Sequence, residues 1–466
     1  MARVLFRQLT WRAATLIVIE HALIVLAVVL AATLRLGTDD TPFLMLDRSL
    51  VYRAVMIAAI LQVCLHYCDL YDFRTLHDRR ELGIGLLRAL GAASLILAFL
   101  YYWFPTLIIG RGVFLLAAVF IVTLVAGWRL AFDWLSLRVG PSERLLLVGT
   151  NAAAVDLARE LYMRRQELGV ELVGFVDPDP AKVGDTVINP GVVGTVAEIP
   201  QIVRDHKVDR VVVSLADARG KLSMDRLLEM KLNEGVMFDH LASVYEEYTG
   251  KIAIENLRPS WFVFSSGFRK SRMFLAAKRA VDVGLAATAL VVLSPLLLLV
   301  GIAVRLTSPG PALYHQVRVG QNNTPFLVHK FRSMRVNAEA ESGAVWAQKQ
   351  DPRVTPIGSF LRRSRLDEFP QLWNVLVGDM SLVGPRPERP EFVEDLTRQI
   401  PFYGQRHVVK PGMTGWAQVR YSYGASVIDA MEKLQYDLFY IKNMSMSLDV
   451  FVLIETIKTV VLRKGT

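Results

Sequence analysis

Long apolar segments dominate the first third of the chain. Four of them lie at about Ala14–Leu34, Leu50–Cys68, Leu86–Phe104 and Val113–Leu135. Each approaches the ~20 residues that an α-helix needs to cross the hydrocarbon core of a bilayer. The first segment is too long for a cleavable signal peptide and lacks a small-residue cleavage site. The pattern therefore predicts four transmembrane helices within residues 1–140.

Arginines flank these apolar segments unevenly. Clusters precede the first segment, follow the second and lie at the end of the fourth: Arg3, Arg7, Arg12, Arg74, Arg79, Arg80, Arg129, Arg138 and Arg144. The other two loops carry fewer arginines and several aspartates. Because short cytoplasmic loops hold the excess of Lys and Arg in membrane proteins, we expect the N-terminus, the middle loop and everything after Leu135 in the cytoplasm.

An α/β pattern follows, and we assign it to a domain spanning 141–270. Apolar strands are predicted at Arg144–Val148, Glu171–Val176 and Asp209–Leu215, with an amphipathic helix after the first strand. Alternating strands and helices indicate a Rossmann-like parallel sheet. The dinucleotide fingerprint is incomplete, since Gly149 is followed closely by three alanines at positions where further glycines are needed. A structural, dimerising or regulatory role is therefore favoured over NAD binding.

A third region, 271–466, opens with an apolar run at about 278–304 that has cations at both ends. Ser294 and Pro295 interrupt its middle, where proline removes an amide donor and clashes with the preceding turn. The run could be a fifth span, a buried helix of a soluble core, or a re-entrant helix that kinks and returns to the same face. Its length disfavours the soluble core, and the proline and the cations at both ends favour the re-entrant helix.

The remainder of this region is polar and rich in motifs. Lys330–Met334 alternates cations with apolar residues at the end of a predicted strand. Glu432–Leu448 is predicted as an amphipathic helix. Phe451–Leu462 is an apolar tail that is too short to span a bilayer and is expected to pack or to lie at the interface.

Composition agrees with a membrane protein. Of 466 residues, 53% are apolar, and the mean hydropathy of +0.34 exceeds that expected of an ordinary soluble enzyme. The formal net charge of +9 does not indicate nucleic-acid binding, since the cations flank apolar segments, where anionic lipid headgroups lie. The two cysteines, Cys64 and Cys68, lie inside an apolar segment and form no disulfide framework.

Charge is concentrated in one stretch of this apolar chain. Three arginines precede the adjacent carboxylates Asp367 and Glu368, and Arg386 follows between two prolines. Carboxylates bind hard cations such as Mg²⁺, and guanidinium groups bind phosphate oxygens. The stretch therefore predicts a metal-assisted reaction on a phosphate. Adjacent residues point in different directions, so one carboxylate could face the phosphorus while the other turns to the metal, and the spacing leaves that assignment open.

Five motifs of the third region lie in a characteristic order. They are Lys278-Arg279…Asp282…Ser294-Pro295, Ser308-Pro309-Gly310-Pro311, Lys330-Phe331-Arg332-Ser333-Met334, Leu366-Asp367-Glu368-Phe369-Pro370-Gln371 and Gly384-Pro385-Arg386-Pro387. Together they resemble the bacterial sugar transferases, the polyprenol-phosphate phosphoglycosyl transferases with a re-entrant catalytic helix, over about Phe274 to Lys464. The N-terminal spans and the α/β domain look like the large exopolysaccharide-initiating members. Tyr245–Ile252 looks like the branch tied to exosortase-type polysaccharide loci.

The resemblance implies transfer of a sugar 1-phosphate from a UDP-sugar, UDP-glucose or UDP-galactose, to undecaprenyl phosphate, with release of UMP. It implies that Asp367 attacks the β-phosphorus and forms a phosphosugar-enzyme intermediate, while Glu368 and Asp367 hold Mg²⁺. Polyprenyl phosphate then attacks that intermediate. The implied location is the cytoplasmic face of the bacterial inner membrane, in contact with its lipids, and a homodimer is expected.

The resemblance also implies roles for other residues. The expected phosphate-binding residues are Arg362, Arg386, Lys330 and Arg332. Tyr436, Asp437 and Asp449 fit the substrate side, whereas Arg279 and Asp282 are expected to anchor the re-entrant helix. The predicted fold is thus a membrane protein of α and α/β elements: a four-helix transmembrane bundle, a Rossmann-like domain, and an α/β catalytic domain with a kinked re-entrant helix.

Two other functions are consistent with parts of this pattern. A membrane-anchored nucleotide-sugar dehydratase or epimerase would need a full glycine fingerprint and a Tyr-x-x-x-Lys pair, and the chain offers neither convincingly. A non-catalytic scaffold of a polysaccharide assembly complex would not need the pair Asp367 and Glu368. Release of UMP from UDP-sugars distinguishes the transferase from both.

Overall fold

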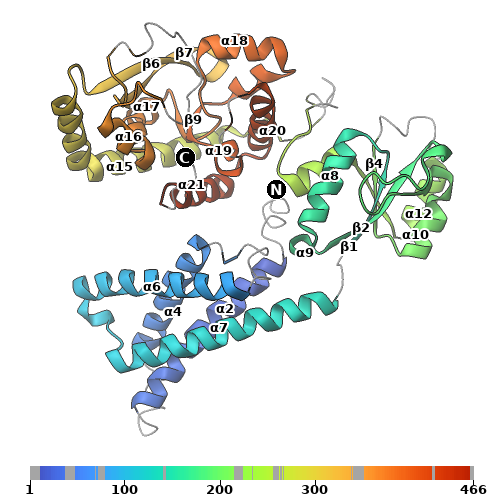
Figure 1. Cartoon of the computed structure of the whole chain (residues 1–466), viewed down its shortest axis with the longest axis horizontal. Coiled ribbons are helices and arrows are strands. Elements are labelled where there is room, and N and C mark those ends of the chain that lie inside the picture. The colour runs from blue at the N-terminus through green and yellow to red at the C-terminus, as the bar shows by residue number, and fades with distance from the viewer. Residues whose placement is uncertain are drawn as a thin grey trace. The chain divides into compact units, whose positions relative to one another are not determined.

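A computed structural model describes most of the chain (Figure 1). The described residues are 11–36, 48–68, 70–71, 79–139, 143–214, 224–233, 235–254, 262, 265, 267–336, 338, 351–421, 424 and 426–461. They form two compact units, one ending at Leu241 and the other beginning at Ala242. Each is described by itself.

The N-terminal part consists of long apolar helices, as the hydropathy pattern predicted, and their crossing of a membrane stays a prediction. They are α2 (Trp11–Leu36), α4 (Arg48–Tyr67), α6 (Arg79–Trp103) and α7 (Arg111–Val139), with a short 3₁₀ turn, η1 (Pro105–Leu107), before α7. Small and aliphatic side chains between them form a common buried cluster, while large apolar side chains such as Leu87 and Leu95 face outward. All four helices are long and apolar enough to cross a membrane.

A buried ion pair crosses this helical cluster. Glu20 of α2 and Arg129 of α7 are both fully buried, and the Arg129 Nε lies 2.6 Å from the Glu20 Oε1. Arg129 also donates to the main-chain oxygen of Leu70. The sequence had suggested that Arg129 is one of the cations that flank the fourth segment. The structure instead uses it to join two helices that are far apart in the sequence.

The following domain is a five-stranded parallel sheet, which confirms the predicted α/β class. The strands are β1 (Glu143–Val148), β2 (Val170–Asp177), β3 (Val192–Thr195), β4 (Arg210–Val213) and β5 (Met237–His240), in the order β3-β2-β1-β4-β5. This order matches the first five strands of the Rossmann order 3-2-1-4-5-6. The intervening helices and turns are α8 (Ala152–Met163), α9 (Arg165–Leu168), η2 (Pro180–Lys182), η3 (Val196–Glu198), α10 (Ile199–His206) and α12 (Met224–Asn233).

Polar groups at the carboxyl edge of this sheet bond to one another. The Thr150 hydroxyl donates to Asp177 Oδ2 at 2.7 Å, and Lys182 Nζ lies 3.2 Å from the same carboxylate. Asn151 accepts from the Ala154 amide at 2.9 Å and so caps the start of α8. The side chains at this edge, where a Rossmann fold binds its dinucleotide, are therefore engaged in contacts with one another.

Helix α13 (Leu241–Thr249) moves the domain boundary predicted from sequence. Segment 242–254, which the sequence assigned to the α/β domain, packs within the second unit. Glu246 accepts hydrogen bonds from Lys442 at 2.5 Å and from Asn443 at 2.8 Å. The Trp416 indole donates to the Gly250 main-chain oxygen at 2.9 Å. Because these contacts reach residues far along the chain, the boundary lies at 241 rather than at 270.

The second unit contains a hairpin, a short parallel strand pair and a layer of helices. The hairpin is β6 (Leu313–Val319) and β7 (Pro325–Phe331), linked by η4 (Gln321–Asn323), and the parallel pair is β8 (Ser381–Val383) and β9 (Gly412–Thr414). The helices are α15 (Arg272–Thr307), α16 (Pro356–Ser364), η5 (Leu366–Glu368), α17 (Gln371–Val377), α18 (Pro390–Gln399), η6 (Tyr403–Val408), α19 (Trp416–Arg420), α20 (Val427–Asn443) and α21 (Met446–Val461).

Two of these helices correct the predicted bounds near the C-terminus. The sequence predicted one helix over Glu432–Leu448, followed by a tail. The structure starts α20 five residues earlier, because Ser426 and Asp429 form a capping box. Helix α20 ends at Asn443, and α21 begins at Met446. Leu448 therefore belongs to α21, together with most of the apolar tail.

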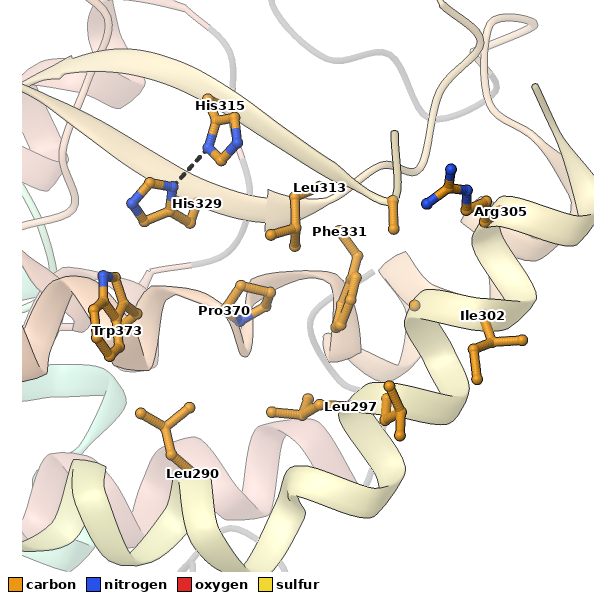
Figure 2. A pocket seen from close by; sticks show the side chains of 13 residues that line it. Leu290, Leu297, Ile302, Arg305, Leu313, His315, His329, Phe331, Pro370 and Trp373 are labelled. Atoms are coloured by element: carbon orange, nitrogen blue, oxygen red, sulfur yellow. Dashed lines mark hydrogen bonds between the residues drawn. The ribbon is translucent and has the colours of Figure 1, made fainter. Parts of the chain in front are cut away.

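Helix α15 corresponds to the predicted kinked helix. Pro295 lies inside it, and the ribbon bends between Leu290 and Arg305 (Figure 2). Near its start, Lys278 pairs with Asp449 at 2.7 Å, and Asp282 accepts from the Ser381 hydroxyl at 2.7 Å. Arg279 donates to two main-chain oxygens at the end of α17.

The other end of α15 packs on the same unit. Val300 and Val304 form a buried cluster with Phe331 and Leu361, whereas the middle of α15 exposes apolar side chains such as Val291. The start and the end of this long helix therefore contact one compact unit.

Candidate active site

The adjacent acids Asp367 and Glu368 lie on the single turn η5 between α16 and α17. Arg365 precedes them in the left-handed region, with φ of 59°, and both ends α16 and starts η5. The left-handed residue ends α16, and α17 begins only at Gln371. The two acids therefore lie on the short turn that connects these helices. Asp367 is buried and Glu368 is nearly so.

Two cations hold Glu368. Its Oε1 accepts from Lys330 Nζ at 2.9 Å and from Arg386 Nη2 at 2.6 Å. Burial alone would raise the pKa of Glu368, but the Arg386 and Lys330 charges outweigh burial and hold the pKa of this carboxyl well below its usual range. Glu368 is therefore an anion at neutral pH.

Asp367 has the opposite environment. Burial first, and the Glu368 charge second, raise the pKa of Asp367 to about 6. Its Oδ1 is buried and has no hydrogen-bond partner within the part of the chain that the structure describes. One acid is thus paired and firmly ionised, while its neighbour carries an oxygen that is available to a ligand.

Lys330 and Arg386 reach Glu368 from distant elements. Lys330 is the second-to-last residue of β7, so it faces away from its neighbour Phe331. Burial lowers the pKa of Lys330. Arg386 lies between two prolines, which limit its backbone freedom. The buried Arg406 donates from Nη2 to the Arg386 main-chain oxygen at 3.0 Å.

Arg362 lies on α16, close enough for its charge to act on Asp367. Its Nε donates to the Ser333 hydroxyl at 2.9 Å. The main chain of Ser333 in turn lies against Gly358 of α16, where a Cβ would meet the Ser333 oxygen at 1.9 Å. Glycine at 358 therefore allows the approach that positions Arg362.

Arg332 is held elsewhere. Its guanidinium donates to the main-chain oxygens of Ser308 and Pro309 at 2.8 and 2.7 Å, at the end of α15. Gly310 follows with φ of 116°, and a Cβ there would collide with this guanidinium. The structure thus uses Arg332 to fix the loop after α15 and does not bring it to Glu368.

The three residues expected on the substrate side have different surroundings. Asp437 pairs with Arg406 at 2.7 Å, and both side chains are buried. Asp449 pairs with Lys278 and accepts from the Tyr440 hydroxyl at 2.7 Å. Tyr436 lies under Lys251, whose Nζ is 5.2 Å from the ring centroid. Asp437 acts on the site through the Arg386 backbone, and Asp449 supports α15.

Models of two known families match the chain. A model of the family described as bacterial sugar transferase matches residues 273–463, and a model described as CoA-binding domain matches residues 66–235. The UDP-glucose:undecaprenyl-phosphate glucose-1-phosphate transferase of Escherichia coli (strain K12) is 34% identical over 343 residues, which cover 71% of this chain and 70% of that protein. The chain belongs to the bacterial sugar transferase family.

Other relatives of this transferase differ in the sugar that their names give. The UDP-N-acetylgalactosamine-undecaprenyl-phosphate N-acetylgalactosaminephosphotransferase of Aeromonas hydrophila is 40% identical over 254 residues, 54% of this chain and 59% of that protein. The UDP-glucose:undecaprenyl-phosphate glucose-1-phosphate transferase of Xanthomonas campestris pv. campestris is 35% identical over 324 residues, 67% of this chain and 66% of that protein. The matched region therefore spans three fifths to two thirds of the length of these two relatives.

The acids of the transferase fit a magnesium ion that is shared with a substrate. No group of three or more His, Cys, Asp or Glu side chains that could hold a metal occurs among the described residues. Mg²⁺ commonly binds one or two carboxylates and completes its shell with water and substrate phosphates. Asp367 and Glu368 offer such a pair, and the unpartnered Asp367 Oδ1 is an oxygen of the required kind.

Sequence reasoning missed two arginines that shape the site of the transferase. Arg406 supports the Arg386 backbone. Arg318 of β6 donates to the Pro387 main-chain oxygen at 3.1 Å and lies 3.5 Å from Glu388. Neither lies in a motif that was recognised. Arg318 lies on β6 and contacts Pro387 and Glu388, which are about 70 residues further along the chain. Its role is therefore seen only once the structure shows which residues pack against this strand.

Proposed function

We propose that the transferase moves a sugar 1-phosphate from a UDP-sugar to undecaprenyl phosphate, releases UMP, and so performs the first membrane step of exopolysaccharide synthesis. Family membership and the activities in the relatives' names support this reaction. The observation that carries it is the pairing of Glu368 with Lys330 and Arg386, beside a buried Asp367 oxygen without a partner.

In the proposed reaction, an Asp367 carboxylate oxygen attacks the β-phosphorus of the UDP-sugar. An oxygen–phosphorus bond to Asp367 forms, the bond from the β-phosphorus to the bridging oxygen breaks, and UMP leaves with that oxygen. A phosphate oxygen of undecaprenyl phosphate then attacks the same phosphorus and displaces the Asp367 carboxylate. The products are a polyprenyl diphosphosugar and the regenerated acid, so the steps balance.

The residues around the dyad supply the charge that this chemistry needs. Phosphoryl transfer depends mainly on positioning and on neutralising the charge of the transferring group. Lys330 and Arg386 lie within hydrogen-bond distance of Glu368, and Arg362 adds a positive charge near Asp367. We propose that Glu368 and Asp367 hold Mg²⁺, which would neutralise negative charge on the diphosphate when bound.

The contacts of α15 support a re-entrant helix. Both ends of the helix pack on one unit, through Lys278 and Asp282 near the start and Val304 near the end. A helix that crossed the membrane would separate its two ends by the bilayer. We therefore propose that α15 lies in one leaflet, that the site lies on the cytoplasmic face of the bacterial inner membrane, and that the four N-terminal helices span this membrane. We also propose contact with inner-membrane lipids and a homodimer like that expected of large members of the family.

The proposed function is tested by UMP release. Purified protein is mixed with undecaprenyl phosphate, Mg²⁺ and one UDP-sugar at a time: UDP-glucose, UDP-galactose or UDP-N-acetylgalactosamine. The wild type should release UMP with at least one donor, and Asp367→Asn should release none above background. Full activity of Asp367→Asn would exclude the covalent mechanism. A wild type inactive with every donor would favour a scaffold.

A further inference from the structure

An apolar cavity lies between the bent half of α15 and the hairpin β6–β7. Its volume is about 660 Å³, within the range of small-molecule pockets. The second half of α15, the hairpin β6–β7 and the start of α17 line it, and it is open to the surface on one side. In Figure 2, Leu290 and Leu297 lie on the α15 side, and Leu313, Phe331 and Trp373 lie across from them.

The cavity adjoins the acids through the chain on both sides of them. Pro370, two residues after Glu368, lines the cavity. Leu366, the residue before Asp367, packs against the cluster that contains Phe331, and Phe331 also lines the cavity. The turn that carries the acids is therefore bounded by apolar residues that face α15, so a ligand in the cavity could place a polar end group at this turn.

The α15 segment that forms one wall also carries an apolar outer surface. Leu298 lines the cavity and is 66% exposed, and the nearby Val291, Val292 and Leu299 are similarly exposed. If α15 lies in one leaflet, hydrocarbon surrounds this wall. A ligand that enters from the membrane therefore meets apolar surface all the way into the cavity.

Gly301 keeps the cavity open on the α15 side. A Cβ at this position would meet only the Phe331 Cε1, at an ordinary contact distance of 3.6 Å. The backbone there is helical, so glycine is not required by conformation. A side chain larger than Ala would extend beyond this contact into the space that the cavity occupies.

We propose that this cavity holds the isoprene units nearest the phosphate of the lipid acceptor, and that Gly301 sets its depth. The inference rests on the proposed function, which supplies a polyprenyl phosphate as acceptor. The cavity is almost wholly apolar, with Arg305 and the pair His315 and His329 among its polar lining residues. A sugar nucleotide would leave its polar groups unsatisfied there, whereas an isoprenoid chain matches the lining.

The position of the cavity favours the acceptor over an ordinary phospholipid. The acceptor phosphate must reach the phosphorus on Asp367, and Pro370, three residues after Asp367, lines the cavity. A phospholipid acyl chain needs no such proximity. A larger side chain that fills the cavity should therefore raise the KM for the acceptor if the acceptor binds there. It should leave this KM unchanged if a phospholipid binds there.

The test replaces Gly301 with Leu and uses Gly284→Leu as a matched control. Gly284 lies on the same helix, and a Cβ there meets nothing within 4 Å. UMP release is followed in nanodiscs with varied undecaprenyl phosphate and with varied UDP-sugar, and thermal midpoints are compared. Gly301→Leu should raise KM for the acceptor about tenfold, a change of ~1.4 kcal/mol, and leave KM for the UDP-sugar within about twofold. Gly301→Ala should change the acceptor KM much less, and Gly284→Leu should change neither constant.

Farnesyl phosphate, with three isoprene units, extends the test to the part of the chain involved. The difference between wild type and Gly301→Leu should persist with this short acceptor, because the cavity holds the units nearest the phosphate. An unchanged acceptor KM in Gly301→Leu would overturn the proposal, as would a difference that disappears with farnesyl phosphate. A loss of kcat with both KM values unchanged would indicate a phospholipid or structural role instead. A wild type that releases no UMP with any donor contradicts the proposed function itself.

Discussion

The Arg406 guanidinium donates a hydrogen bond to the main-chain oxygen of Arg386, 3.0 Å away. The same group pairs with Asp437 at 2.7 Å and donates to the Tyr403 hydroxyl at 2.7 Å. Arg386 in turn contacts Glu368. A buried charge pair on η6 and α20 thus determines where the backbone of an active-site arginine lies.

Arg406→Lys should lower kcat for UMP release by about 10²-fold, because a displacement of about 1 Å can cost that much. Lysine keeps the positive charge beside Asp437 but lacks the planar fork that contacts three partners. Steady-state UMP release and the thermal midpoint are measured together. Arg398→Lys, in an exposed pair with Glu394, is the control and should retain wild-type kinetics. A folded Arg406→Lys protein with wild-type kcat would show that Arg386 does not depend on this support.

Glu368→Gln should lower kcat by about 10²–10³-fold, the range seen when one preorganised electrostatic contact is removed. Glutamine has nearly the same shape but leaves Lys330 and Arg386 without their anion. UMP release is measured over a range of Mg²⁺ concentrations, with Glu391→Gln on the surface of α18 as the control. If the Mg²⁺ concentration that gives half-maximal UMP release is the same for Glu368→Gln and wild type, Glu368 is not a metal ligand.

Asp367→Asn should change the pH dependence of stability. The folded protein raises the pKa of Asp367 to about 6 from its ordinary value of 3.8. Between these values the folded state binds a proton that the unfolded state does not, so the Asp367 contribution to wild-type stability rises as pH falls from 7 to 4. Asparagine cannot titrate. In EDTA, the thermal midpoint of Asp367→Asn should exceed that of wild type most at pH 7.5.

This difference should shrink towards pH 4, because folded wild-type Asp367 becomes protonated and is then neutral like asparagine. The other titrating groups are common to both proteins and cancel. Thermal midpoints in detergent at half-unit pH intervals provide the measurement. A difference that stays constant from pH 4 to 7.5 would mean that the pKa of Asp367 is not raised in the folded protein.

Arg129→Met should destabilise the N-terminal helices by ~3–5 kcal/mol, because it leaves Glu20 buried without its partner. The double variant Glu20→Leu/Arg129→Met should recover much of this loss, since apolar residues of similar size suit a buried site. Thermal aggregation in detergent is compared for the single and double variants. A double variant less stable than Arg129→Met would show that the pair contributes net stability.

Cysteine labelling tests the membrane placement of α15. In a background of Cys64→Ala and Cys68→Ala, Thr307→Cys should react with an impermeant thiol reagent only after the cells are permeabilised. Ile108→Cys, in the exposed segment between α6 and α7, should react in intact cells. Labelling of Thr307→Cys from outside would contradict both the re-entrant helix and a cytoplasmic site.

The sequence predicted elements best where one pattern is long or strongly apolar. The N-terminal helices have uninterrupted apolar stretches, and the central strands β1 and β4 are almost wholly buried. The strands β3 and β5 were missed because each has four residues and lies at a sheet edge, with exposed positions that weaken the pattern.

Within the site, the sequence could identify residues but not their partners. Asp367, Glu368, Lys330 and Arg386 lie in recognisable motifs, and the structure brings them together. Arg332 lies in the same motif as Lys330, yet β7 ends at Phe331, so Arg332 lies beyond the strand and donates to the loop after α15. Such differences depend on where a strand ends and on which elements pack beside it, and those elements are distant in sequence.

The docking of segment 242–254 on α20 determines where a catalytic fragment can be cut. A fragment that begins at Arg272, the first residue of α15, would remove the Gly250 oxygen that the Trp416 indole requires and leave Lys442 without Glu246. A fragment that begins before Leu241 keeps both contacts. The smallest piece of this chain suited to expression, limited proteolysis or crystallisation therefore includes α13, which begins at Leu241, whereas the family match begins at residue 273.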